Sequence, residues 1–169
     1  MGKFFRMSNH FNKHSAKDFG LIDNGDNTAT DPNDGSLWKR GALYDNGWGS
    51  ENGYYKVPLP SFPVLLKILL NENDIEDVYG AAAIIESYYP NELLEQCEKM
   101  ISDPNYTKDF VKMSAVFHLE RSLNRCNIVG KTFDEIMADS SRWKKVSEFA
   151  SRIKKYNERF PRQLFKQEK

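Results

Sequence analysis

Hydrophobic positions recur with helical spacing from about residue 60 to residue 160. The segment "PLPSFPVLLKILLN" places Ser61 at a helix N-cap and Pro63 inside the first turn, where its missing N–H costs little. The segment "NDIEDVYGAAAIIESYY" opens on an Asn/Asp cap and runs to Tyr89, where Pro90 ends one helix and begins the next. Both segments therefore predict helices with well-marked ends.

Three further segments continue this helical pattern. "PNELLEQCEKMISD" has an apolar stripe made of Leu93, Leu94, Cys97, Met100 and Ile101. "PNYTKDFVKMSAVFHLERSLNRC" predicts a longer helix that ends near Gly130, and "TFDE" at 132–135 is a capping box. Asp139 or Ser140 is expected to cap a last long helix that runs through Phe160 and stops at Pro161.

The first 57 residues have a different pattern. They contain eight of the ten glycines and no sustained helical period. Asn-Gly pairs occur at 24–25, 46–47 and 52–53, and such pairs between short apolar pieces indicate tight turns. We expect one or two short strands between Leu37 and Val57, which would form a small β-hairpin.

The stretch "IDNGDNTATDPNDG", residues 22–35, is rich in Asp and Asn and suggests a calcium loop. No register that its glycines allow places oxygen ligands at the positions that an EF-hand requires. We therefore interpret it as a polar connection that Asx-type turns and contacts with the helical body hold in place.

The predicted fold class is mainly α. Five or six helices over about residues 60–160, joined by short loops, form a compact helical bundle or a short stack of helical hairpins. An irregular N-terminal segment, 1–57, packs on the helical body, 58–160, and a basic tail, 161–169, follows it. With 169 residues, the chain is predicted to form one domain.

Composition narrows the class of protein. A hydrophobic fraction of 40% and an aromatic fraction of 13% exclude a disordered chain. The longest apolar run is interrupted by Lys67 and is too short for a membrane span, and the N-terminus has no secretory signal pattern. Cys97 and Cys126 are more typical of two free thiols than of a disulfide. These features predict a cytoplasmic protein.

The net charge is zero, but the charges are segregated along the chain. Residues 57–103 contain two basic and nine acidic residues, whereas the last 28 residues contain ten basic and three acidic ones. This segregation favours either an intramolecular match between acidic and basic helices or two surfaces for different partners.

The leading functional hypothesis is a non-enzymatic protein-binding module. One form of it is an inhibitor or an immunity or antitoxin-type protein that covers a basic toxin or enzyme with its acidic 57–103 surface. Aromatic residues in the glycine-rich segment either anchor a partner or pin that segment onto the helical body. The predicted partner-binding residues are Glu72, Asp74, Glu76, Asp77, Glu92, Glu95, Trp38, Trp48 and Tyr54.

Two alternatives stay open. Glu86 and Glu120 lie on or beside predicted apolar helix faces. A buried carboxylate with a raised pKa can serve as a general acid. The first alternative is therefore a small hydrolase or lyase that uses these two glutamates, together with His118. The second is a nucleic-acid-associated protein that tracks phosphates with its basic C-terminal helix. The chain lacks P-loop, dinucleotide and nucleophile-elbow motifs, and His10 and His14 lack the other ligands of a metal site. We therefore expect no cofactor and no metal.

Overall fold

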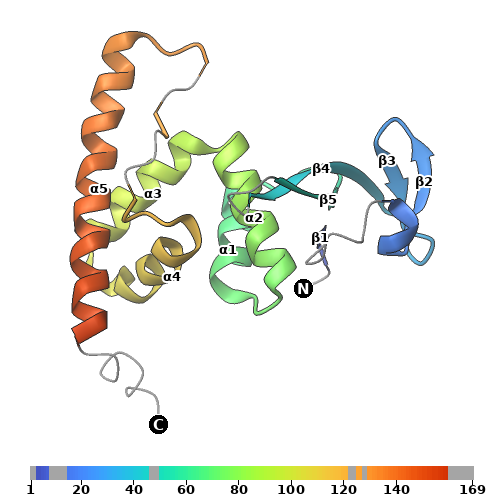
Figure 1. The fold of residues 1–169 in the computed structure, drawn as a ribbon, viewed down its shortest axis with the longest axis horizontal. Helices are drawn as coiled ribbons and strands as arrows, with labels where there is room; N and C mark the ends of the chain where they lie inside the picture. Colours follow the sequence, from blue (N-terminus) through green and yellow to red (C-terminus); the bar gives the residue numbers. More distant parts are fainter. Residues whose placement is uncertain (1–2, 8–14, 46–49, 122–124, 127–128, 160–169) are drawn as a thin grey trace. The chain divides into compact units, whose positions relative to one another are not determined.

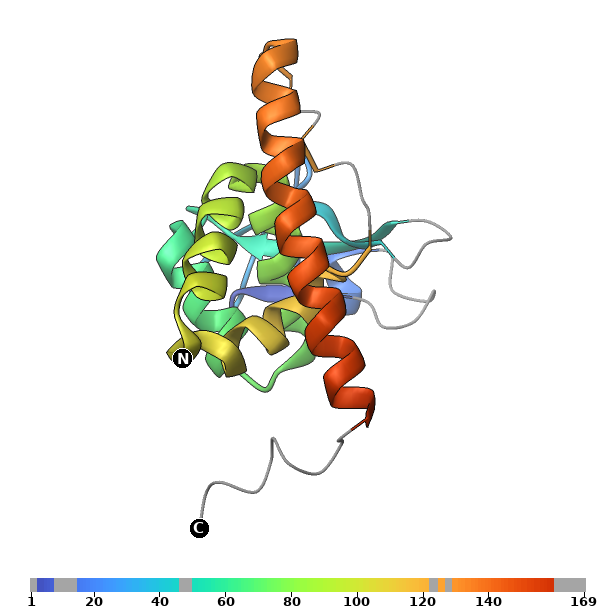
Figure 2. The same ribbon diagram turned by 90° about the vertical axis from the view of Figure 1, so that its left-hand side faces the viewer.

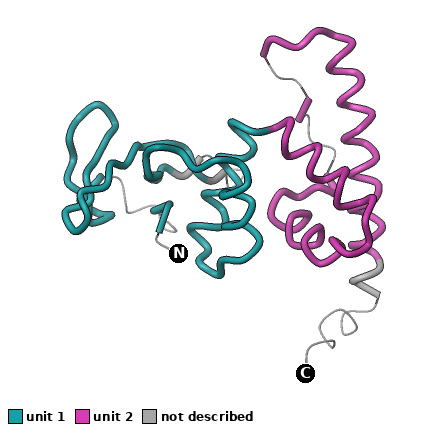
Figure 3. Tube along the Cα trace, turned by 180° about the vertical axis from the view of Figure 1, so that it is seen from behind, with its two compact units in different colours: residues 1–89 teal, residues 90–169 magenta. Residues whose placement is uncertain are grey.

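The computed structural model describes residues 3–7, 15–45, 50–121, 125–126 and 129–159. The chain forms two compact units, residues 1–89 and residues 90–169, which Figure 3 colours separately. The division falls between Tyr89 and Pro90 and not near residue 57, where the composition changes. That residues 1–169 behave as one domain stays a prediction.

Unit 1, residues 1–89, is built on a five-stranded antiparallel sheet (Figure 1). Its strands are β1 (Phe5–Met7), β2 (Ile22–Gly25), β3 (Thr28–Thr30), β4 (Leu37–Asp45) and β5 (Ser50–Lys56), in the spatial order β1-β5-β4-β3-β2. The prediction of a mainly α, all-helical protein with an irregular N-terminal third is therefore wrong. The protein has a mixed α/β fold, and the glycine-rich segment supplies all five strands of this sheet.

The predicted hairpin between Leu37 and Val57 exists as the β4–β5 pair. The polar stretch 22–35 also forms a hairpin, which the sequence interpretation missed. Asp26 and Asn27 have φ angles of 54° and 59°, and they connect β2 to β3 through a two-residue turn that matches the right-handed twist of the strands.

Asx turns brace this hairpin and the loop that follows it, as the sequence predicts. The side chain of Asp23 accepts a hydrogen bond from the Gly25 N–H, and Asp34 accepts one from the Ser36 N–H, each at 2.9 Å. The buried Asp31 carboxylate, however, pairs with Arg6 of β1 and not with a helix. A side chain of the sheet thus holds this part of the loop.

Alternation along the strands gives the sheet two buried faces. Phe5 and Met7 lie on the face that α2 (Ile75–Tyr88) covers, and Phe5 packs so closely on α2 that only a glycine, Gly80, fits opposite its ring. Helix α1 (Phe62–Asn71) packs on α2. The other face holds a second small core made of Ala16, Leu21, Ala29, Trp38 and Tyr54.

A short 3₁₀ helix, η1 (Ala16–Phe19), contributes to this second core. The guanidinium of Arg6 lies 4.7 Å from the centre of the Trp38 ring, and Arg6 also donates a hydrogen bond to the Phe19 carbonyl at 2.6 Å. The N-terminal strand therefore contributes to both faces, with Phe5 on one and Arg6 on the other.

Unit 2, residues 90–169, is helical. It contains α3 (Pro90–Ser102), the 3₁₀ helix η2 (Pro104–Tyr106), α4 (Thr107–Phe117) and α5 (Phe133–Arg159). Figure 2 shows α5 as one unbroken helix. Its core includes Leu93, Leu94, Cys97, Phe110, Met113, Val146 and Ala150, all almost inaccessible to solvent. Among the described residues, no helix is both long enough and apolar enough to cross a membrane.

Local signals located most helix ends correctly, and two boundaries differ. The predicted caps at Ser61, Asp74 and Pro90 mark the starts of α1, α2 and α3. Helix α4 ends at Phe117, because His118 adopts a left-handed conformation with φ 51°, so the predicted continuation toward Gly130 is wrong. The capping box at 132–135 begins the last long helix itself, and not a separate shorter one.

Candidate partner-binding groove

The described part of unit 2 contains an open groove of about 610 Å³ along one side of α5. The helix contributes residues at the spacing that places side chains on one face: Ile136, Met137, Ser140, Trp143, Lys144, Ser147 and Glu148. The opposite wall comes from the chain that follows α4: Leu119, Arg121, Arg125 and Cys126. The described residues that follow the end of α4 at Phe117, 119–121 and 125–126, therefore supply the side of the groove that α5 does not.

The floor of the groove is apolar and its rim is charged. Leu119, Cys126 and Trp143 are each no more than 9% exposed, so they form a packed surface. The side chains of Arg121 and Lys144 are exposed at the rim. Within the part of the chain that the structure describes, neither of these two cations forms an ion pair.

Arg125 is fixed against the floor. Its guanidinium lies 5.5 Å from the centre of the Trp143 ring, and it donates a hydrogen bond to the carbonyl of Phe117 at the end of α4. Stacking and this hydrogen bond together hold a positive charge in one position beside the apolar floor.

Glu120 ties the wall of the groove to α5. Ser147 donates a hydrogen bond to its backbone carbonyl at 3.2 Å, and the Lys154 ammonium lies 2.9 Å from its carboxylate. Burial acts to raise the pKa of Glu120, but the hydrogen bond and charge of Lys154 outweigh that effect and hold the pKa below its usual value. Glu120 is therefore ionised at neutral pH.

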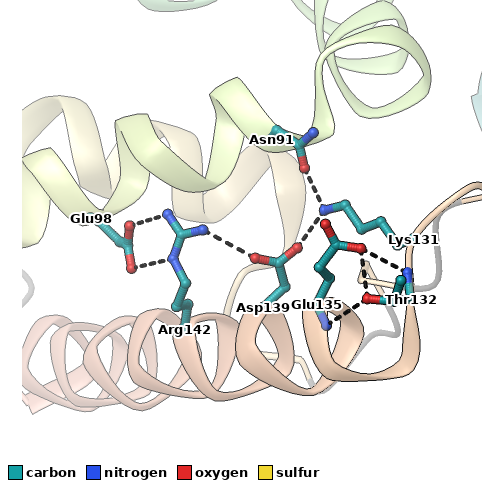
Figure 4. A network of polar contacts seen from close by, with 7 residues as sticks. All are labelled: Asn91, Glu98, Lys131, Thr132, Glu135, Asp139 and Arg142. Atoms are coloured by element: carbon teal, nitrogen blue, oxygen red, sulfur yellow. Dashed lines mark hydrogen bonds and ion pairs between the residues drawn. The ribbon is translucent and has the colours of Figure 1, made fainter.

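A polar network fixes α5 to α3 (Figure 4). Arg142 donates to both carboxylate oxygens of Glu98, at 3.0 and 2.6 Å, and to Asp139 at 3.0 Å. Lys131 donates to Asp139 and to the side chain of Asn91. Asp139 and Arg142 lie on a different side of α5 from the groove residues, so the network anchors the helix without occupying the groove.

The charges in this network are mutually stabilising. The hydrogen bond from Arg142 holds the pKa of Glu98 below its ordinary value, and the hydrogen bond from Lys131, against the effect of burial, does the same for Asp139. Two cations thus compensate two carboxylates, and the groove is presented on a rigid element.

Several of the predicted acidic residues form contacts within unit 1 and do not form a free surface. Asp74 caps α2 and, with Glu76, forms ion pairs with Lys3, at 3.5 and 2.5 Å. Asp77 is only 6% exposed, and its carboxylate accepts hydrogen bonds from the N–H groups of Phe4 and Phe5. Glu72 is half-buried after α1.

Glu92 and Glu95 are exposed on α3 in unit 2. These two glutamates are the predicted acids that face solvent most plainly, because the neighbouring Leu93 and Leu94 are buried and turn the glutamates outward.

The predicted aromatic anchors lie mostly in the core. Trp38 is 1% exposed and Tyr54 is 4% exposed, and both pack in the second core of the sheet. Trp48 lies outside the described residues, as do His10 and His14. The neighbours of Trp38 and Tyr54 in this second core all belong to the N-terminal segment itself, so these two residues hold that segment together and do not pin it onto the helices.

The predicted acid–base residues do not converge within one unit. Glu86 is exposed in unit 1, whereas Glu120 and the exposed His118 belong to unit 2. The Cys97 thiol is fully buried, which raises its pKa to about 12 and keeps it protonated. The hydrolase or lyase hypothesis stays a prediction, and the low pKa of Glu120 is opposite to what a general acid needs.

Comparisons with known proteins leave the site to be interpreted from its own chemistry. No family model matches the chain, and neither a curated protein nor a solved structure matches it. Among the described residues, no group of three or more His, Cys, Asp or Glu side chains is placed to hold a metal ion. The groove is the feature that sequence reasoning missed, because its second wall was assigned to a helix.

Proposed function

We propose that the protein is a non-enzymatic protein-binding module that holds a segment of its partner in the groove on α5. The observation that carries this proposal is the groove itself, with an apolar floor and a charged rim on a helix that the Glu98–Arg142 network anchors. Interfaces have this arrangement, in which apolar contacts supply affinity and the polar rim supplies specificity.

Exposed apolar side chains at the N-terminal end of α5 support the same proposal. Phe133 is 74% exposed and Met137 is 53% exposed, and the four-residue spacing puts them on one face of the helix. Val129, just before this helix, is fully exposed. Large apolar side chains exposed on one helix face are typical of interaction sites.

In a narrower form of the proposal, the protein is an inhibitor or immunity-type protein that also contacts a basic toxin or enzyme through acidic residues of α3, which do not line the groove. The exposed Glu92 and Glu95 on α3 support an acidic contact surface. Reversing both charges with Glu92→Lys and Glu95→Lys is then expected to slow association and to weaken its salt dependence. A cytoplasmic location, consistent with the free thiols of Cys97 and Cys126, is part of this proposal.

Affinity capture from the native cell with matched variants tests the general proposal. Phe133→Glu and Met137→Glu disrupt the apolar face beside the groove, whereas Ile75→Glu places the same charge on an apolar residue of unit 1 that is 59% exposed. We expect proteins that the wild type enriches to be lost with both α5 variants and retained with Ile75→Glu. If all three variants retain the same proteins, the groove is not the binding surface.

A further inference from the structure

We propose that the occupant of the groove is an acidic amphipathic helix of the partner. This inference rests on the proposed function and adds the chemistry of the bound segment. Three observations support it: the charges on the rim, the shape and apolar floor of the groove, and the backbone groups of α5, which are already hydrogen-bonded within the helix.

The rim selects an acidic segment. Three cations line the groove, Arg121, Arg125 and Lys144, against one acid, Glu148. Residues 90–169 as a whole contain sixteen basic and twelve acidic residues, so the surrounding charge has the same sign. An acidic segment therefore meets complementary charge, and a basic one is repelled. The chain's own residues 160–169 have three basic residues and one acidic residue, so their charge does not suit this groove.

The walls favour a helix as the bound form. The α5 wall spans Ile136 to Glu148, which at a rise of 1.5 Å per residue is about 18 Å, the length of a helix of about 12 residues. Backbone groups inside α5 are bonded within the helix, so this wall offers no hydrogen bonds to an extended strand. A partner helix satisfies its own backbone and needs only to place apolar side chains on the floor, at i, i+3, i+4 and i+7.

The floor disfavours a nucleic acid as the occupant. Trp143 is 9% exposed and lies beneath the Arg125 guanidinium, so its ring face is not offered to a base. Ile136, Met137 and Leu119 supply aliphatic surface, which suits Leu or Ile side chains better than a phosphate backbone. The cations of the rim alone would attract an RNA, so an RNA probe is included in the test.

The experiment measures binding of defined fluorescent probes to the full chain by anisotropy. The first probe is a 16-residue designed helix with Leu at i, i+3, i+4 and i+7 and Glu at most other positions. Its controls are a peptide of the same composition in scrambled order, a peptide with Lys in place of Glu, and a single-stranded RNA of equal charge. The protein variants are Lys144→Glu and Arg121→Glu on the rim, with Lys155→Glu as an exposed α5 cation outside the groove.

We expect the acidic amphipathic probe to bind at least about tenfold more tightly than each control probe. Each rim variant should weaken its binding by about tenfold at low salt, and Lys155→Glu should change it by less than about twofold. Equal binding of the scrambled peptide, the Lys peptide or the RNA, or no binding of the acidic probe, overturns the inference. Self-association of the chain that Met137→Glu abolishes would instead identify a second copy as the occupant and also overturns it.

The two proposals fail separately. If the acidic probe does not bind but Phe133→Glu and Met137→Glu still lose captured partners, then the protein-binding function stands and the identity of the bound segment is wrong. If the capture is unaffected by both variants, the function itself fails, whatever the peptides do.

Discussion

The carboxylate of Asp77 lies 3.0 Å from the backbone nitrogen of Phe5, a residue 72 positions earlier in the chain. The same oxygen also accepts a hydrogen bond from the N–H of Phe4 at 3.0 Å. One side chain of α2 thus satisfies two backbone donors at the start of β1. The acid belongs to the segment whose negative charge suggested a partner surface, and here it holds the N-terminal strand in unit 1.

Replacing Asp77 with Ala should destabilise unit 1 by about 2 kcal/mol, because the buried N–H of Phe5 and the part-buried N–H of Phe4 lose their acceptor. Asp77→Asn is the matched control, since its side-chain carbonyl oxygen can accept both hydrogen bonds. Chemical denaturation combined with hydrogen exchange at the amides of β1 measures both variants. Equal stability of the Ala and Asn variants would show that the two hydrogen bonds contribute little.

The stability of the Asp77→Asn variant relative to wild type should also depend on pH. Burial raises the pKa of Asp77, although the N–H groups of Phe4 and Phe5 act to lower it. A carboxyl with a raised folded-state pKa binds its proton more readily in the folded state, so its contribution to stability falls as pH rises from about 3.8 through the raised pKa. The asparagine variant should therefore gain stability relative to wild type between pH 4 and 7, as measured by urea unfolding at each pH. A difference in stability between the two proteins that stays constant across this range would contradict a raised pKa for Asp77.

Gly80 is required by the packing of α2 on β1. A methyl group at this position would lie 2.3 Å from Cγ of Phe5 and 2.6 Å from its Cβ, which are not the flexible end of that side chain. Alanine improves helix propensity by about 1 kcal/mol, but the clash should cost more, so we expect Gly80→Ala to destabilise unit 1 by about 1–2 kcal/mol.

A double-mutant cycle with Phe5→Ala tests this cause, because this change removes the Cγ and Cδ1 atoms of Phe5, which would lie 2.3 and 2.5 Å from the new methyl group. The cost of Gly80→Ala measured by urea unfolding should shrink in the Phe5→Ala background. Strict additivity of the two changes would exclude direct contact as the reason.

The network between α3 and α5 should make unit 2 sensitive to acid. The pKa values of Glu98 and Asp139 are held below their ordinary values of 4.5 and 3.8 by the cations around them. Their contribution to stability is therefore complete above about pH 4.5 and is lost as the pH falls through the lowered folded-state pKa values. Arg142→Met should remove about 1 kcal/mol at neutral pH and flatten this acid dependence.

Lys154→Met is the control for the network, because Lys154 is 54% exposed and pairs with the single carboxylate of Glu120. We expect it to cost less than about 0.5 kcal/mol. Thermal denaturation of both variants from pH 3 to pH 7, followed by hydrogen exchange in α5, distinguishes loss of the Arg142 network from loss of the Lys154–Glu120 ion pair. A profile for Arg142→Met that stays parallel to that of wild type would remove the network as the source of acid sensitivity.

The helices could be predicted from the sequence because their signals are local. Asp74 and the Thr132–Glu135 capping box each act within one turn of the backbone they cap, and Ser61 marks the start of α1 by its position, without a side-chain capping hydrogen bond. The sheet could not be predicted in the same way. Strands β1, β2 and β3 have three or four residues, too few to show alternation, and β1 pairs with β5 about 50 residues later. Contacts over such a distance leave no local pattern.

The candidate site was predicted only in part, for the same reason. The outward position of Glu92 and Glu95 follows from the periodic burial of Leu93, Leu94 and Cys97. The groove depends on His118 ending α4 in a left-handed conformation, which an apolar periodicity that continues past it does not reveal. Similarly, charge counting cannot distinguish Asp77, which bonds to backbone, from an acid that faces solvent.

Arg6 should be the most sensitive cation of unit 1. Its guanidinium pairs with Asp31, donates to the Phe19 carbonyl and lies over Trp38, and Asp31 is only 5% exposed. Arg6→Met should cost about 3 kcal/mol, because it leaves a buried carboxylate without its cation. Arg6→Lys should recover less than half of this loss, since one ammonium cannot replace a planar group that bonds to two acceptors and stacks on an indole. Adding Asp31→Asn to Arg6→Met removes the uncompensated charge and should restore part of the stability in urea unfolding. No recovery in this double variant would mean that stacking on Trp38, and not the ion pair, dominates the role of Arg6.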